Sequence, residues 1–180
     1  TDWVESVADL ARGAVVEVDG HCVIPMPLFG RSVDRPFKFR DATKKLRKQR
    51  LQRRWPNLDL PVETYGGELP FEPVMVEHQL VDPTQRWSLL RRCNVDPTVH
   101  PVWRFKGGEQ AALARWQAFK EKGLNGYARR RNNAADANGV SRMSAYIHYG
   151  MISPMKIARE AAEVGTKSAE KYLDLSLIHI

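Results

Sequence analysis

The sequence predicts a chain of two unlike parts, an α/β-type segment near its start and an all-helical part near its end, joined by a long connection. Three observations lead to this prediction. A helical stripe precedes a short β-branched run at residues 14–18. Seven prolines punctuate residues 56–101. From Phe105 onward, apolar residues recur at helical spacing between short turns.

The first segment begins with apolar residues on one helical stripe in residues 3–11. Residues 14–18 (AVVEV) are typical of a buried strand, and a second apolar run follows at residues 22–24. Asp19 and Gly20 between the two runs indicate a hairpin. A helix followed by a buried strand is also how an α/β unit ends, so the sequence leaves both alternatives open.

A densely basic helix is expected next. Residues 25–39 are punctuated by proline and glycine, which predicts a loop, and Asp41 is placed to cap the helix that follows. This helix either faces phosphate groups or presents a solvated surface anchored by Leu46 and Leu51, and the charge density alone favours the solvated surface. The basic residues are Lys44, Lys45, Arg47, Lys48, Arg50, Arg53 and Arg54.

The C-terminal part is expected to consist of successive helices. Residues 109–122 predict a helix with an apolar face, which Gly123 ends. Ser141 or Ser144 is placed to cap a short helix, Ser153 followed by proline begins another, and Ser168 begins a last one. The apolar face of the first of these helices consists of Ala112, Leu113, Trp116 and Phe119.

Composition and charge narrow the class of protein. Of the 180 residues, 43% are hydrophobic and 27% are charged, which predicts a globular chain. The formal net charge of +7 favours a polyanionic partner such as nucleic acid. No membrane-spanning run or signal peptide is evident, so we expect a cytoplasmic or nucleoid-associated protein with no membrane partner. Cys22, Cys93 and His148 show no metal-ligand spacing, and we expect neither a metal site nor a disulfide.

Residues 138–144 (NGVSRMS) place a glycine, two hydroxyls and a guanidinium at the entry to a short helix. Unpaired backbone N–H groups and the helix dipole favour an anion there, and serine and arginine add directed donors. The segment is therefore a candidate phosphate site. The alternative is ordinary: a serine that caps the helix and an arginine in a surface ion pair.

The wider stretch, residues 127–153, resembles the start of the FAD domain in photolyases and cryptochromes. The shared pieces are Tyr127, Arg131, the loop 132–139, Val-Ser-Arg-Met-Ser at 140–144, Gly150, and Ser153 with Pro154. Tyr-Ala-x-x-Arg-Asn-Asn, together with residues 105–108 (FKGG) and 148–150 (HYG), is most similar to the class II cyclobutane pyrimidine dimer photolyases. Residues 15–19 and 37–40 are similar to the end of the α/β domain of that class.

The resemblance implies a fold for each part of the chain. Residues 1–55 would be the end of a Rossmann-like antenna domain, and residues 56–104 an interdomain linker. Residues 105–175 would be the first helices of an all-α FAD-binding domain. Residues 176–180 depart from the family pattern and are expected to be a non-native tail. The chain would then be a fragment of a longer enzyme, inactive by itself.

The resemblance also implies site residues. The FAD diphosphate would lie against residues 140–144, with Tyr127 beside the cofactor and Arg131 reaching the DNA near the lesion. The alternatives are a core aromatic for Tyr127 and a surface arginine for Arg131. Val140 replaces the usual threonine, so only its backbone could serve, whereas Met143 replaces leucine at similar volume. The cofactor-binding set is Tyr127, Val140, Ser141, Arg142, Met143 and Ser144.

The function implied is light-dependent DNA repair by a lyase, in which electron transfer from reduced FAD splits cyclobutane pyrimidine dimers. The flavin carries the chemistry, so no catalytic acid, base or nucleophile is expected. The partner would be UV-damaged DNA and the protein a monomer, with an antenna chromophore that the sequence does not identify. The alternatives are a cryptochrome-like FAD photoreceptor and a non-enzymatic basic module that binds nucleic acid through residues 44–54.

Overall fold

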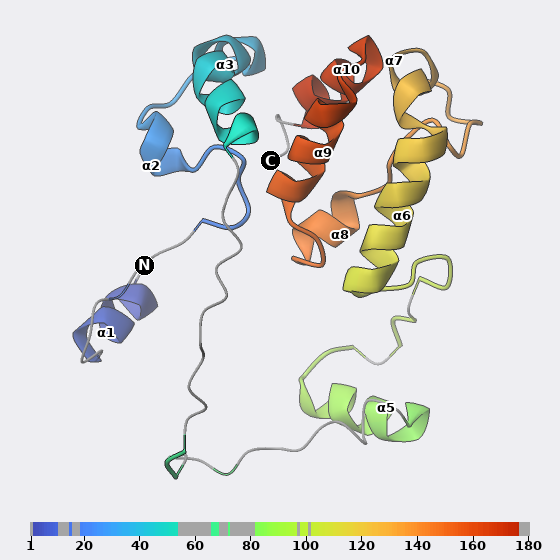
Figure 1. Ribbon diagram of the computed structural model, residues 1–180. Helices are drawn as coiled ribbons and strands as arrows, with labels where there is room; N and C mark the ends of the chain where they lie inside the picture. Colours follow the sequence, from blue (N-terminus) through green and yellow to red (C-terminus); the bar gives the residue numbers. More distant parts are fainter. Residues whose placement is uncertain are drawn as a thin grey trace. The chain divides into compact units, whose positions relative to one another are not determined.

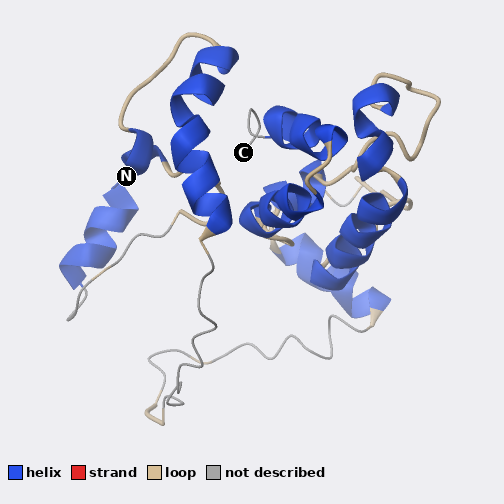
Figure 2. Cartoon of the chain, turned by 45° about the horizontal axis from the view of Figure 1, so that its top comes forward, coloured by secondary structure: helices blue, strands red, loops and turns tan. Residues whose placement is uncertain are grey.

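The computed structural model describes residues 2–10, 15, 19–53, 66–68, 72, 82–96, 98–100 and 102–176. Within these ranges, every regular element is a helix (Figures 1 and 2). The chain divides into two compact units. Unit 1 comprises Thr1–Trp55 and Gly107–Ile180, and unit 2 comprises Pro56–Lys106. The domain boundaries inferred from the resemblance remain a prediction.

The N-terminal stretch of unit 1 contains α1 (Asp2–Leu10), α2 (Met26–Phe29) and α3 (Pro36–Gln52). The helix predicted near residues 3–11 is confirmed, but the loop predicted for residues 25–39 is wrong, because it contains α2 and the first turn of α3. Proline starts α3 well, since its fixed φ suits the first helical turn and its missing N–H needs no partner there. Asp41 therefore lies inside α3 rather than capping it.

The predicted strand at residues 14–18 lies outside the described residues except for Val15, which is exposed. Residues 22–24 form no strand, and the chain bends at Val23 and Ile24. The Asp19 carboxylate shapes this turn by accepting hydrogen bonds from the backbone N–H groups of His21 and Cys22, each at 3.0 Å. The α/β origin of residues 1–55 remains a prediction.

The C-terminal stretch of unit 1 is helical, as its periodicity predicts. Ser153 caps α9 by accepting from the Lys156 N–H at 3.4 Å. Thr166 caps α10 by accepting from the Ala169 N–H at 3.2 Å. This helix therefore begins at Lys167, one residue before Ser168. The elements are α6 (Glu109–Lys122), η1 (Leu124–Gly126), α7 (Tyr127–Arg130), α8 (Ser144–His148), α9 (Pro154–Val164) and α10 (Lys167–Ser176).

An aromatic core joins these helices. Trp116 and Phe119, from the predicted face of α6, are buried against Tyr172 of α10, with ring centroids 5.7 and 5.4 Å away. Tyr127 of α7 packs edge-on against Phe119 and Tyr172. Fully buried Leu124 and Met143 extend the cluster. Aromatic packing therefore holds α6, α7 and α10 at fixed positions around residues 140–144.

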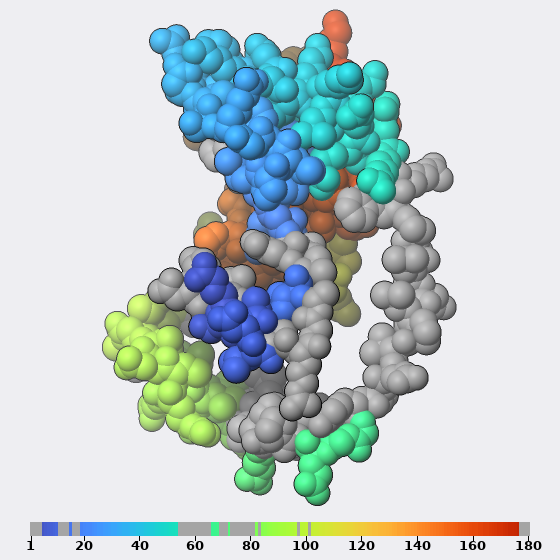
Figure 3. All heavy atoms as spheres, turned by 90° about the vertical axis from the view of Figure 1, so that its left-hand side faces the viewer, coloured from blue at the N-terminus to red at the C-terminus, as the bar shows by residue number. Residues whose placement is uncertain are grey.

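A smaller apolar cluster joins α3 to α9. Buried Val23 and Ile24 contact Ala158, with Leu46 and Leu51 packed around them. The Arg50 Nε donates to the Val23 carbonyl at 2.6 Å, which ties the bend at residues 22–24 to α3. In Figure 3 the cyan atoms of α3 border those of the C-terminal helices, in agreement with the contact between α3 and α9.

Unit 2 contains α5 (Pro83–Arg92). The Asp82 carboxylate caps this helix by accepting from the Thr84 N–H at 2.8 Å. The connection punctuated by prolines therefore contains a helix, because Pro83 starts this helix after its capping residue instead of breaking one. None of the helices in the described ranges has the length and apolar character needed to cross a membrane.

Candidate functional site

A pocket of about 750 Å³ opens between α7, α8 and α10 and the loop that leads into α8. This volume falls within the roughly 300–1,000 Å³ of small-molecule sites. Its walls combine aromatic rings, hydroxyls and one guanidinium, and no carboxylate stands among the described residues that line it. The lining consists of Tyr127, Arg131, Ser141, Met143, Ser144, Ala145, Ile147, His148, Tyr172, Leu175 and Ser176.

The backbone of the pocket's loop is held from behind by Arg115 of α6. The Arg115 Nε donates to the Ser141 carbonyl at 2.8 Å, and its Nη2 donates to the Val140 carbonyl at 3.1 Å. The next residue, Arg142, adopts the left-handed backbone conformation with φ 57°, which is uncommon for residues other than glycine. The paired hydrogen bonds from Arg115 help to stabilise this turn.

The Ser141 hydroxyl is oriented by two donors. Buried Tyr172 donates its phenolic O–H to the Ser141 Oγ at 3.2 Å, and the Met143 N–H donates to the same oxygen at 3.4 Å. Burial raises the pKa of Tyr172, which keeps its phenol protonated as a donor. With both acceptor positions used, the hydroxyl proton of Ser141 is left for an acceptor in the pocket.

Arg131 supplies the positive charge of the pocket. Its Nε atom is buried and has no hydrogen-bond partner among the described residues. Burial raises the pKa of Tyr127, and the positive charge of Arg131 opposes that rise, as expected for neighbouring side chains. A buried N–H without a partner is unfavourable, so the pocket suits a ligand that brings an acceptor oxygen to Arg131.

The structure therefore brings five of the seven residues proposed from the sequence to one pocket: Tyr127, Arg131, Ser141, Met143 and Ser144. Arg131, which the resemblance assigned to DNA rather than to FAD, lines the same pocket as Ser141 and Ser144. Arg142 is exposed and, like Val140, is not among the residues that line it. Neither serine caps α8 with its side chain, because Met143 occupies the N-cap position.

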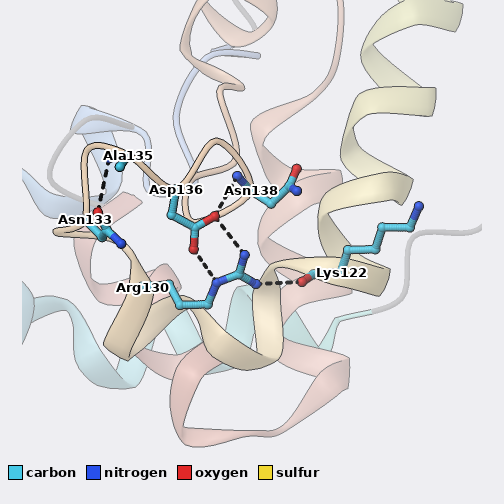
Figure 4. A network of polar contacts seen from close by, with 6 residues as sticks. All are labelled: Lys122, Arg130, Asn133, Ala135, Asp136 and Asn138. Atoms are coloured by element: carbon cyan, nitrogen blue, oxygen red, sulfur yellow. Dashed lines mark hydrogen bonds and ion pairs between the residues drawn. The ribbon is translucent and has the colours of Figure 1, made fainter.

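The loop between α7 and α8 is fixed by Arg130 (Figure 4). Its Nε and Nη2 donate to the two carboxylate oxygens of Asp136 at 2.5 and 2.8 Å, and its Nη1 donates to the Lys122 carbonyl at 3.0 Å. A hydrogen bond from Arg130 lowers the pKa of Asp136, so the carboxylate stays charged. A Cβ atom at Gly139 would lie 2.8 Å from the Arg130 carbonyl, so only glycine permits this close approach.

Sequence reasoning missed Arg115 and Tyr172. Arg115 lies 26 residues from Ser141 and Tyr172 lies 31 residues from it, and nothing in the local motif points to either. Both were detectable only as parts of helices, Tyr172 as an apolar-face residue of the last helix.

The pocket as a whole offers hydroxyl and guanidinium donors beside aromatic rings, which suits a ligand carrying phosphate and a planar ring. No group of His, Cys, Asp or Glu in the described ranges could hold a metal ion.

Comparison with known proteins points repeatedly to one class, the DNA photolyases. No family model matches the chain, and no solved structure matches it. The curated relatives are each named deoxyribodipyrimidine photo-lyase, and they support the photolyase family for this chain.

Three of these relatives come from an archaeon, a bacterium and a plant. The one from Methanothermobacter thermautotrophicus is 39% identical over 61 residues, 34% of this chain and 14% of the relative. The one from Thermus thermophilus is 42% identical over 66 residues, 37% of this chain and 16% of the relative. The one from Arabidopsis thaliana is 27% identical over 164 residues, 87% of this chain and 31% of the relative. The chain thus spans about a third or less of each relative's length.

Proposed function

We propose that this chain is part of a light-dependent DNA repair enzyme, a flavoprotein that splits cyclobutane pyrimidine dimers and is most similar to the class II photolyases. Residues 1–55 are then the end of an α/β antenna domain, and residues 105–175 open the helical domain that binds FAD. UV-damaged DNA is the substrate. The curated relatives support this proposal at the level of the family.

One observation carries the proposal from the side of the structure. The serines, the tyrosine and the arginine of one continuous stretch, residues 127–144, line a single pocket with a buried guanidinium nitrogen that has no partner among the described residues. Residues brought together only to cap a helix or cover a surface would not need to share a cavity. Their convergence fits a bound anionic ligand.

Each side chain has a definable part in binding. The Ser141 hydroxyl, oriented by Tyr172, and the Ser144 hydroxyl donate to the diphosphate, while Arg115 holds the backbone behind them. Tyr127 forms an aromatic wall. Arg131 lines the same pocket and, as the resemblance implies, reaches the DNA near the lesion. Bound FAD would supply the photochemical electron transfer, and these residues bind and orient it.

The test uses the whole protein, obtained by extending the reading frame beyond both ends of this sequence. We expect it to purify with flavin absorbance and to repair dimer-containing DNA under blue light. In the variant with Ser141→Ala and Ser144→Ala, flavin retention should fall about tenfold or more, because hydrogen bonds to charged groups contribute roughly 1.5–3 kcal/mol each. Ser32→Ala changes an exposed serine outside the pocket and should leave flavin retention unchanged.

Arg131→Ala separates the two partners. We expect it to weaken binding to dimer-containing DNA more strongly than it lowers flavin content, with Arg129→Ala, an exposed neighbour, as control. A protein without flavin would contradict the proposal. A protein that holds flavin but repairs no DNA would instead be a photoreceptor of the cryptochrome type.

A further inference from the structure

A second recess of unit 1, here called the basic groove, lies between α3 on one side and α9 and α10 on the other. Its volume is about 1000 Å³, and it shares no lining residue with the pocket described above. Among the described residues that line it, five carry cationic side chains and three carry acidic ones. The groove is therefore a separate feature with an excess of positive charge.

The cationic wall comes from one stripe of α3. Lys44, Lys48 and Leu51 recur at helical spacing along the side that lines the groove. Leu51 packs into the small apolar cluster that joins α3 to α9, which fixes the rotation of the helix. Lys44 and Lys48 are exposed and form no ion pair among the described residues. The groove thus presents two available ammonium groups one helical turn apart.

The facing wall leaves room for a ligand. This wall contains the small residues Ala161, Ala162 and Gly165, whose side chains leave the space between the two walls unfilled. Arg159 of α9 adds a cation to this wall, and its Nη2 donates to the Arg50 carbonyl at 3.5 Å. The positive charge is therefore shared between α3 and α9 and depends on how they pack.

Arg47 lies at the base of the cationic wall and is only partly satisfied. Its side chain is 15% exposed, and its Nη2 lies 3.6 Å from the Asp174 carboxylate. The Nη1 atom is buried and has no hydrogen-bond partner among the described residues. A guanidinium can donate to two oxygens of one anion, so Arg47 retains donor capacity that Asp174 does not use.

We propose that the basic groove binds the phosphodiester backbone of DNA without regard to sequence or damage. Lys44 and Lys48 stand about 6 Å apart along the helix axis and can pair with successive phosphates, a match that a single small anion would not need. Arg47 donates to a phosphate oxygen at the base of the groove. The groove acts independently of the flavin pocket, and holds duplex DNA by charge.

The test measures binding of the chain to an undamaged, fluorescein-labelled DNA duplex by anisotropy between about 50 and 200 mM salt. Replacing Lys44 and Lys48 together by alanine should lower the slope of log K against log salt by about 2, because each phosphate contact contributes about 0.9. Affinity should fall roughly tenfold or more near 100 mM salt. The control removes the same charge from the same helix with Lys38→Ala and Lys45→Ala, which do not line the groove.

Arg47→Lys gives a second variant that keeps the charge but removes the forked donor. It should also weaken binding, and circular dichroism should show each variant folded as the parent is. The proposal is overturned if the duplex does not bind, if both lysine pairs lower the slope equally, or if polyglutamate binds with the same dependence on Lys44 and Lys48. None of these outcomes affects the proposed repair function, since the assay uses no flavin and no lesion.

Discussion

The pocket and the basic groove lie in the same unit of the chain but differ in the kinds of side chain that line them. Rings and hydroxyls surround the pocket, which lies against a core containing Trp116 and Tyr172. Charged side chains surround the groove, which lies against a small cluster around Val23 and Ala158. Packing or hydrogen bonds hold Tyr127, Ser141 and Tyr172 of the pocket, whereas most charged side chains of the groove are exposed.

This difference indicates how each recess would recognise a ligand. Preorganised donors in a buried wall suit a ligand of defined shape, because little side-chain entropy is lost on binding. Exposed lysines on a helix suit a polyanion, because they respond to charge more than to shape. A change in the aromatic core should therefore damage the pocket, and a change in salt should mainly affect the groove.

The largest expected effect is the loss of the aromatic core. Trp116→Ala should lower the free energy of unfolding by about 3–5 kcal/mol, because it leaves a large cavity beneath Tyr172 and removes an indole N–H that donates to Glu160 at 2.8 Å. Urea denaturation would measure this loss. The control Trp103→Ala changes a side chain that is 82% exposed and should alter stability by about 0.5 kcal/mol or less. Equal effects of the two changes would contradict a core centred on Trp116.

The second effect compares two glutamates of α9, one beside the aromatic core and one at the groove. Burial would raise the pKa of Glu160, but hydrogen bonds from Lys120, Lys156 and Trp116 outweigh it and lower this pKa from 4.5 to about 2. The stabilising contribution of the carboxylate is therefore present above about pH 4.5 and is lost as pH falls toward 2.

Glu160→Gln should remove this pH dependence, which amounts to about 1–2 kcal/mol after screening by solvent. Urea denaturation at several values between about pH 5 and 2.5 would show it as a flatter profile. Glu163→Gln, at an exposed position lining the groove, should leave the profile of the parent unchanged. A Glu160→Gln profile as steep as that of the parent would disprove the assigned role.

A smaller effect tests the orientation of Ser141. Tyr172→Phe keeps the stacked ring but removes the O–H that donates to the serine, at an expected cost of about 0.5–1.5 kcal/mol. Hydrogen exchange at the Met143 amide, which donates to the same oxygen, should become faster. Tyr149→Phe, at a side chain 72% exposed, should change neither quantity. Unchanged exchange at Met143 in Tyr172→Phe would show that the serine needs no such support.

The smallest effect on global stability is expected at the loop between α7 and α8. Arg130→Ala removes the donors to Asp136 and to the Lys122 carbonyl, so amides of residues 136–139 should exchange faster while the midpoint of unfolding changes little. Arg129→Ala removes an exposed neighbour with the same charge. Equal exchange in the two variants would mean that the loop is held mainly by its backbone turns.

By itself, the sequence determined the local structure where periodicity and caps agree. The helices at residues 109–122 and 154–164 follow from apolar spacing and from Ser153, and the serine-arginine segment marks the candidate site. The sequence interpretation was wrong at two prolines, because Pro36 and Pro83 each begin a helix rather than interrupt one.

Tertiary structure alone decided which distant side chains meet. Tyr172 reaches Ser141, Arg115 holds the backbone of the same loop, and the basic stripe of α3 faces α9 across a groove. Capping and periodicity depend on residues a few positions apart, so the sequence displays them directly. Contacts between residues 25 or more apart depend on how the whole core packs, and many sequences with the same local pattern could pack differently.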